Sequence, residues 1–203
     1  MRVFAPRFAA PLDTPRPRGA RLLEAFSPKQ GRRVRFFDHA CFAQWIRLEA
    51  DPDVLDLCER PTRLGSERDA RLVDFWIRHA EGEQLVLLED GGAGADPEMF
   101  DGVPVHRVAA AELAAAAVWI ANWQKMLPVI VAAGPVLPAG LAQSVLKSLR
   151  EPTALSRLEH DFSVGDPPVV RGAIFELLRT GQLRAPSLHE RPLSPYTLLE
   201  PAE

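Results

Sequence analysis

Apolar residues recur at helical spacing near the start of the predicted folded region. Between Asp38 and Glu49 they fall every three or four positions, which places them on one face of an α-helix. Asp38 stands where an N-cap residue accepts free backbone N–H groups, and Asp51-Pro52 stops the pattern. We therefore predict a helix over residues 38–49 with one buried face.

Shorter patterns after this helix predict a small sheet. Apolar and polar residues alternate over 54–58 and 70–77, which is the period of a half-buried strand. Residues 84–88 form a short run of branched apolar side chains, and 103–108 have the composition of one more strand. The segment from residue 34 to residue 108 is thus predicted to be mixed α/β.

From residue 109 onward the spacing of apolar residues is helical. A short helix, a turn, a longer helix ending at Gly181 and an extended stretch over 182–185 resemble a winged helix-turn-helix. A small helical bundle is the alternative for this half. The predicted helices cover residues 110–131, 141–149, 154–159 and 169–180.

The first 33 residues carry prolines, arginines and small residues without sustained periodicity. We predict a basic flexible arm over 1–33, with a short helix near 21–26. The chain has a net charge of −3, yet residues 1–35 hold nine basic side chains against Asp13 and Glu24. Such an arm suits DNA, whose counterions are released on binding, although a solvated chain end has the same composition. The side chains predicted to contact DNA are Arg16, Arg18, Arg21, Lys29, Arg32, Arg33 and Arg35.

Composition predicts a soluble cytoplasmic protein with no membrane partner. Hydrophobic residues make up 47% and charged residues 25%, and no apolar run approaches the ~20 residues of a membrane span. The start of the chain lacks the continuous apolar run of a secretory signal. Cys41 and Cys58 have no zinc-type spacing, which favours free thiols in a reducing compartment. Cys41 falls on the apolar helix face, where we expect an inert, buried thiol.

The order of short motifs carries more information than any one of them. Arg33-Val34-Arg35-Phe36 is followed by Leu48 to Val54, then by Glu59-Arg60-Pro61, Val73-Asp74-Phe75 and Leu85 to Glu89. In this order the chain resembles the TnsA-type endonuclease subunits of transposons. Asn122 matches an asparagine in a helix of that family, and residues 178–183 are similar to a phrase near the end of its members.

The resemblance implies a fold in two parts. It implies an α/β restriction-endonuclease-like domain over 34–108, followed by a mainly helical, winged-helix-like domain over 109–203. In the family, a helix of the first domain precedes a strand with a Pro-Asp-Phe-like element and a second strand with a Glu/Gln-X-Lys element. The family's partners, implied here as well, are DNA, a DDE transposase similar to TnsB and an AAA+ regulator similar to TnsC.

The resemblance also assigns an active centre. Such nucleases hold Mg²⁺ between carboxylates on the sheet, with a lysine beside the attacking water. Asp74 and Glu89 are the catalytic candidates by position, and Asp38 is a third candidate that could substitute, shifted by one residue, for the glutamate of the family's first helix. The implied metal ligands are Asp74 and Glu89. The alternatives are a helix N-cap for Asp38, a strand-end cap for Asp74 and an exposed acidic turn for Glu89.

Two departures from the family pattern weaken this centre. Phe37 stands where the family has a glutamate, and Asp90 replaces the lysine. Between Lys29 and Lys125 the sequence contains no other lysine. We therefore expect a DNA-binding transposition component whose nuclease centre is degenerate, without a cofactor. The alternatives are an active endonuclease that cuts at transposon ends with Mg²⁺, and a protein-interaction module that does not bind DNA.

Overall fold

The computed structural model describes residues 6–67, 69–89, 97–162 and 167–202. The chain divides into two compact units, which are described separately. The first comprises residues 1–48 with 53–114, and the second comprises 49–52 with 115–203. The division after residue 114 lies close to the boundary predicted at residue 108. Within the described ranges, no helix combines the length and the apolar character that a membrane span requires.

The first unit begins its regular structure with a β-hairpin. Strand β1 (Leu23–Ser27) pairs antiparallel with β2 (Arg32–Phe36), and Gly31 takes a left-handed φ of 63° in the turn between them. The predictions of a flexible arm up to residue 33 and of a helix over 21–26 are therefore wrong. The alternation of Val34 and Phe36 inward with Arg33 and Arg35 outward is a strand period that the surrounding charge obscured.

Helix α1 (His39–Ala50) forms where predicted. The backbone N–H of Cys41 donates to Asp38 Oδ1 at 2.7 Å, so the N-cap role of Asp38 is confirmed. The apolar face of the helix packs through aromatic rings whose centroids lie 5.6–6.1 Å apart. These rings are Phe42 and Trp45 of α1, Phe36 of β2 and Phe75 of the central sheet.

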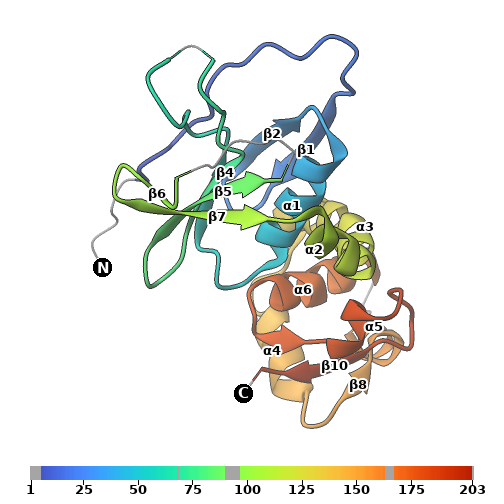
Figure 1. Ribbon diagram of the computed structural model, residues 1–203. Helices are drawn as coiled ribbons and strands as arrows, with labels where there is room; N and C mark the ends of the chain where they lie inside the picture. Colours follow the sequence, from blue (N-terminus) through green and yellow to red (C-terminus); the bar gives the residue numbers. More distant parts are fainter. Residues whose placement is uncertain (1–5, 68, 90–96, 163–166, 203) are drawn as a thin grey trace. The chain divides into compact units, whose positions relative to one another are not determined.

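A five-stranded mixed sheet forms the centre of the first unit, with the order β3-β4-β5-β7-β6 (Figure 1). Its pairs are antiparallel except β5 with β7, which run parallel. The strands are β3 (Asp56–Glu59), β4 (Phe75–Arg78), β5 (Glu83–Leu88), β6 (Met99–Phe100) and β7 (Val103–Val108). The strands predicted over 54–58, 84–88 and 103–108 are confirmed, whereas only the end of 70–77 joins the sheet.

Strand β4 starts with an irregularity that matters for the site. Phe75 pairs with Val86, yet the carbonyl of Val86 also accepts the N–H of Asp74 at 3.1 Å. Two residues thus stand opposite one, which is a β-bulge. The usual alternation fails there: Val73 and Trp76 share one buried cluster, and Asp74 and Phe75 both line a pocket beside α1.

The second unit is built on helix α3 (Ala117–Ala133) and helix α6 (Pro167–Arg179). The helix predicted over 110–131 is divided at Ala116 into α2 (Ala110–Ala115) and α3. After α3 come η1 (Gly134–Val136), α4 (Leu141–Ser148), β8 (Thr153–Ala154), α5 (Leu155–Phe162), α6, β9 (Leu183–Arg184), η2 (Pro186–His189) and β10 (Leu198–Pro201). The short strands pair antiparallel in the order β8-β10-β9, and Figure 1 shows this C-terminal part in yellow to red.

One buried polar residue, Asn122, connects two parts of the second unit. Asn122 is buried in α3, where its side-chain amide donates to the carbonyls of Leu188 and Arg191, and its Oδ1 accepts the N–H of Leu193. These three bonds tie the segment before β10 to α3.

Gly181 ends α6 with a φ of 69°, which confirms the predicted C-cap.

Candidate active site

A pocket of about 340 Å³ in the first unit brings together the N-terminus of α1, the bulge of β4 and the chain before β1. Its walls carry several ionisable side chains. They are three carboxylates (Asp38, Glu59 and Asp74), one thiol (Cys41) and two arginines (Arg60 and Arg63). Asp38 and Asp74, two of the predicted catalytic residues, thus line one cavity although 36 positions separate them in the sequence.

Asp74 is held from two sides. Its Oδ2 accepts the backbone N–H of Leu88 at 2.8 Å, and its Oδ1 accepts the thiol of Cys41 at 3.3 Å. Burial raises the pKa of the Asp74 carboxyl, and the negative charge of Asp38 acts in the same direction. The two hydrogen bonds and the positive charge of Arg71 oppose the rise. Asp74 is therefore positioned by the fold and easier to protonate than an exposed aspartate.

Cys41 turns toward this pocket, whereas the sequence predicted a core position. Burial raises the pKa of the Cys41 thiol, and the charges of Asp74 and Asp38 raise it further. The thiol form thus dominates at neutral pH, and a thiol is a much weaker nucleophile than a thiolate. The sequence-based rejection of Cys41 as a nucleophile agrees with this environment.

Asp38 lines the pocket with an exposed side chain, one of whose oxygens caps α1. Glu89 is exposed beyond the end of β5 and does not line the pocket, although its N–H donates to the carbonyl of Val108 at 3.0 Å. Asp90 lies outside the described residues. In the described part of the chain, no group of three or more His, Cys, Asp or Glu side chains could hold a metal ion. The pairing of Asp74 with Glu89 around Mg²⁺ remains a prediction.

Glu59 is the pocket carboxylate that sequence reasoning missed. Its side chain is 2% exposed, and Arg32 donates to both of its oxygens, at 2.8 Å and 2.6 Å. Arg60 approaches the same carboxylate at 3.9 Å. In the sequence, Glu59 stands out only as part of a Glu-Arg-Pro motif. Its position at the end of an apolar strand was the signal that it would be buried and in need of a cation.

The predicted DNA-contacting side chains separate into two groups. Four of them have structural partners. The Lys29 ammonium donates to the carbonyls of Leu48 and Val54 at 2.7 Å, Arg32 pairs with Glu59, and Arg35 pairs with Glu24 at 2.9 Å. Arg16 donates to the carbonyl of Ala20 at 2.8 Å but stays exposed. The other three predicted contacts, Arg18, Arg21 and Arg33, have exposed side chains.

Helix α6 has little exposed surface for reading DNA bases. Most of its length is buried, and its two arginines are engaged within the second unit. Arg171 bonds to Glu159 of α5, while Arg179 bonds to Glu176 at 2.5 Å and lies 3.8 Å from Glu49. A helix that enters the major groove presents free polar side chains to base edges. The second unit therefore offers weaker support for sequence-specific DNA contact than its order of elements suggests.

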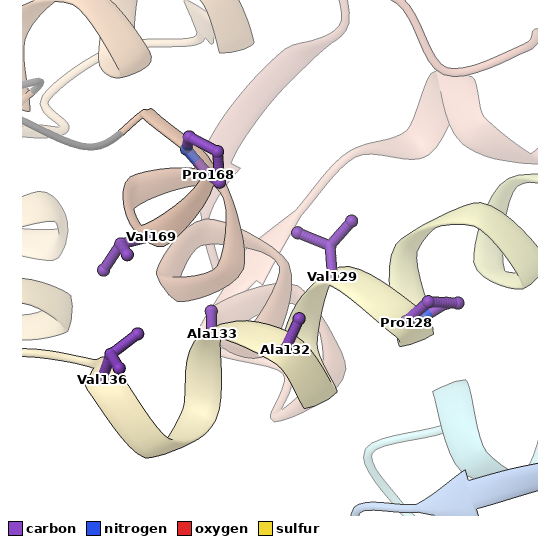
Figure 2. A pocket seen from close by; sticks show the side chains of 7 residues that line it. All are labelled: Pro128, Val129, Ala132, Ala133, Val136, Pro168 and Val169. Atoms are coloured by element: carbon purple, nitrogen blue, oxygen red, sulfur yellow. The ribbon is translucent and has the colours of Figure 1, made fainter.

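A second hollow lies in the second unit, between the end of α3 and the start of α6 (Figure 2). Its volume is about 320 Å³, and it is lined only by proline, valine and alanine. Val129 and Ala132 of α3 face it from one side, and Pro168 and Val169 of α6 from the other. Its walls contain no group that could transfer a proton or bind a metal.

Comparison of the sequence with known proteins gave no match, either to a protein-family model or to a curated protein.

Proposed function

We propose that this protein is a TnsA-like component of a DNA transposition complex, which binds DNA ends and partner transposase subunits through a nuclease fold whose catalytic centre is degenerate. The observation that carries the proposal is the meeting of Asp38 and Asp74 in one pocket, at the start of α1 and at the bulge of β4. A carboxylate at a helix start beside a carboxylate on a sheet is the arrangement that the resemblance implies.

The order of elements supports the same proposal. Helix α1 precedes β4, which begins directly after Asp74, and β5 lies beside β4 in the sheet. This is the helix, Asp-bearing strand and second strand expected of a restriction-endonuclease-like domain. In the second unit, α5 and α6 followed by the antiparallel β9 and β10 support a winged-helix-like domain.

The surroundings of Asp74 favour a degenerate centre over an active one. Both carboxylate oxygens already accept a hydrogen bond, from Leu88 and from Cys41, and burial raises the pKa of this carboxyl, which disfavours the ionised form that binds a metal. The cation whose charge acts on Asp74 is Arg71, which donates to the carbonyl of Leu88 at 2.7 Å. A guanidinium stays protonated and is a poor substitute for a lysine in proton transfer. The protein's role would then be assembly.

The decisive experiment compares wild type with Asp74→Ala on duplex DNA that carries the transposon end, with Mg²⁺, alone and with the partner subunits. We expect neither protein to cut this DNA, because the loss of one well-placed electrostatic donor already slows such chemistry by about two to three orders of magnitude. Strand joining should be equal in both. The control is the exposed Asp13→Ala variant.

Cutting that requires partners and disappears in Asp74→Ala would instead establish the active endonuclease. Absence of salt-dependent DNA binding would favour the third hypothesis, an interaction module independent of DNA.

A further inference from the structure

We propose that residues 8–17 form a strap that covers one side of the pocket of Asp38, Cys41 and Asp74, and that release of the strap widens access to this pocket. This inference rests on the proposed function in one respect: DNA is taken to be the ligand that reaches the pocket after the strap is released.

The strap is anchored first on the face of the sheet that does not carry α1. Phe8 packs edge-on against Trp76, with ring centroids 5.9 Å apart, and contacts the buried cluster around Trp76. Beside it, Arg7 pairs with the Asp101 side chain and donates to the Asp101 carbonyl at 3.0 Å. An edge-to-face aromatic pair stabilises such a contact beyond the area it buries.

The chain then reaches the pocket at the end of strand β3, which is an edge strand of the sheet. The N–H of Leu12 donates to the carbonyl of Arg60 at 2.8 Å. Arg60 has a φ of 49°, a left-handed conformation that is uncommon for a residue with a side chain. Directly after this bond, Thr14, Pro15 and Pro17 line the pocket together with Asp38 and Asp74.

The composition of the strap suits reversible closure. Pro11, Pro15 and Pro17 restrict the backbone, which lowers the entropy lost when the segment is held extended. The anchors described are an aromatic contact, one arginine and one backbone hydrogen bond, and such segments open locally at far lower cost than the whole domain. Arg16 lies in the strap, Arg18 directly follows it, and both side chains are exposed. A polyanion such as DNA that binds these arginines would favour the released strap.

Cys41 is a built-in reporter of this opening, because its thiol lies in the pocket under the strap. The other cysteine, Cys58, is fully buried in the cluster around Trp76 and reports global unfolding. We would label the full-length protein with a small maleimide at fixed pH and follow each cysteine by peptide mass spectrometry. The variants are Phe8→Ala, which removes the anchor without touching the pocket, and a deletion of residues 1–17. Asp13→Asn, in an exposed position of the strap, is the matched control.

We expect Cys41 to react about tenfold faster in Phe8→Ala and in the deletion, which corresponds to ~1.4 kcal/mol of anchoring. Cys58 lies in the cluster on which Phe8 packs but is held inside the β3–β4 pairing, so it should accelerate less than Cys41, and the control should keep the wild-type rate. An unchanged Cys41 rate in both strap variants would overturn the proposal, and so would equal acceleration of both cysteines in both variants.

Adding duplex DNA to wild type separates this inference from the proposed function. Acceleration of Cys41 by DNA supports both. If the strap variants accelerate labelling while DNA neither binds nor changes it, the strap is supported and the DNA-related function fails.

Discussion

At the residue scale, Asp74 gives the clearest link between position and chemistry. A bulge turns this side chain toward α1 together with Phe75, and its oxygens bond to Leu88 and Cys41. Since burial raises the pKa of Asp74, the folded state holds the proton more tightly than the unfolded state does. The contribution of Asp74 to the free energy of unfolding is therefore largest at low pH, where this carboxyl is protonated in both the folded and the unfolded state. It falls as pH rises from the ordinary value of 3.8 through the raised folded pKa.

We predict that Asp74→Asn increases stability near pH 7, by about 0.5–2 kcal/mol, because it removes the cost of a buried charge and keeps an oxygen for the Leu88 N–H. The gain should shrink as pH falls toward the ordinary carboxyl value of 3.8. Denaturant unfolding at several pH values measures it, with Asp13→Asn as the exposed control. Asp74→Ala should destabilise by roughly 1–3 kcal/mol, since it leaves the Leu88 N–H without its acceptor. A loss of stability in Asp74→Asn at neutral pH would contradict the assigned direction.

At the scale of elements, the close approach of α3 and α6 depends on one glycine. A Cβ on Gly172 would lie 2.2 Å from the Cβ of Ala133, far below any contact distance. The two helices meet through their smallest side chains, which explains the burial of much of α6. This close approach of α3 and α6 belongs to the core packing of the second unit. It buries surface of α6 that a DNA-reading helix would need to expose.

We predict that Gly172→Ala lowers the free energy of unfolding by about 1–3 kcal/mol, the usual cost of overpacking a core. Ala121→Leu, at an exposed position of α3, is the control, because it adds a larger side chain to the same helix without entering the core. Thermal unfolding of both variants makes the comparison. The double variant Gly172→Ala with Ala133→Gly should recover part of the stability, and a neutral Gly172→Ala would show that the helices can separate at little cost.

At the scale of the whole molecule, the basic N-terminal region serves the fold as well as any partner. Lys29 binds backbone carbonyls and Arg32 binds Glu59, so deleting the region would remove strand β1 along with its charge. Substitution of the exposed arginines tests DNA contact without this damage.

We predict that a triple variant with Arg18, Arg21 and Arg33 changed to glutamine binds duplex DNA more weakly and with a flatter salt dependence. The slope of log affinity against log salt should fall by roughly 0.9 for each phosphate that the variant no longer neutralises. The control changes three exposed cations of the second unit, Lys125, Lys147 and Arg150, to glutamine and so carries the same net charge. Equal effects of the two triple variants would show that net charge, and no particular surface, governs binding.

Sequence alone predicted the elements that depend on local patterns. The period of apolar residues located α1, and short segments of strand-like composition located β5 and β7. Residue chemistry identified Asp38 as an N-cap and Gly181 as a C-cap. These features depend on neighbours within a few positions, which is the distance over which a pattern carries information.

Tertiary structure decided everything that depends on distant partners. Only folding reveals that Arg32 neutralises Glu59, that Cys41 bonds to Asp74, and that the segment before β1 lines a pocket. The bulge at Asp74 cannot be read from alternation, because it arises from pairing with Val86. An ion pair or a pocket forms between residues far apart in the chain, and its free energy depends on burial and geometry that no local spacing encodes.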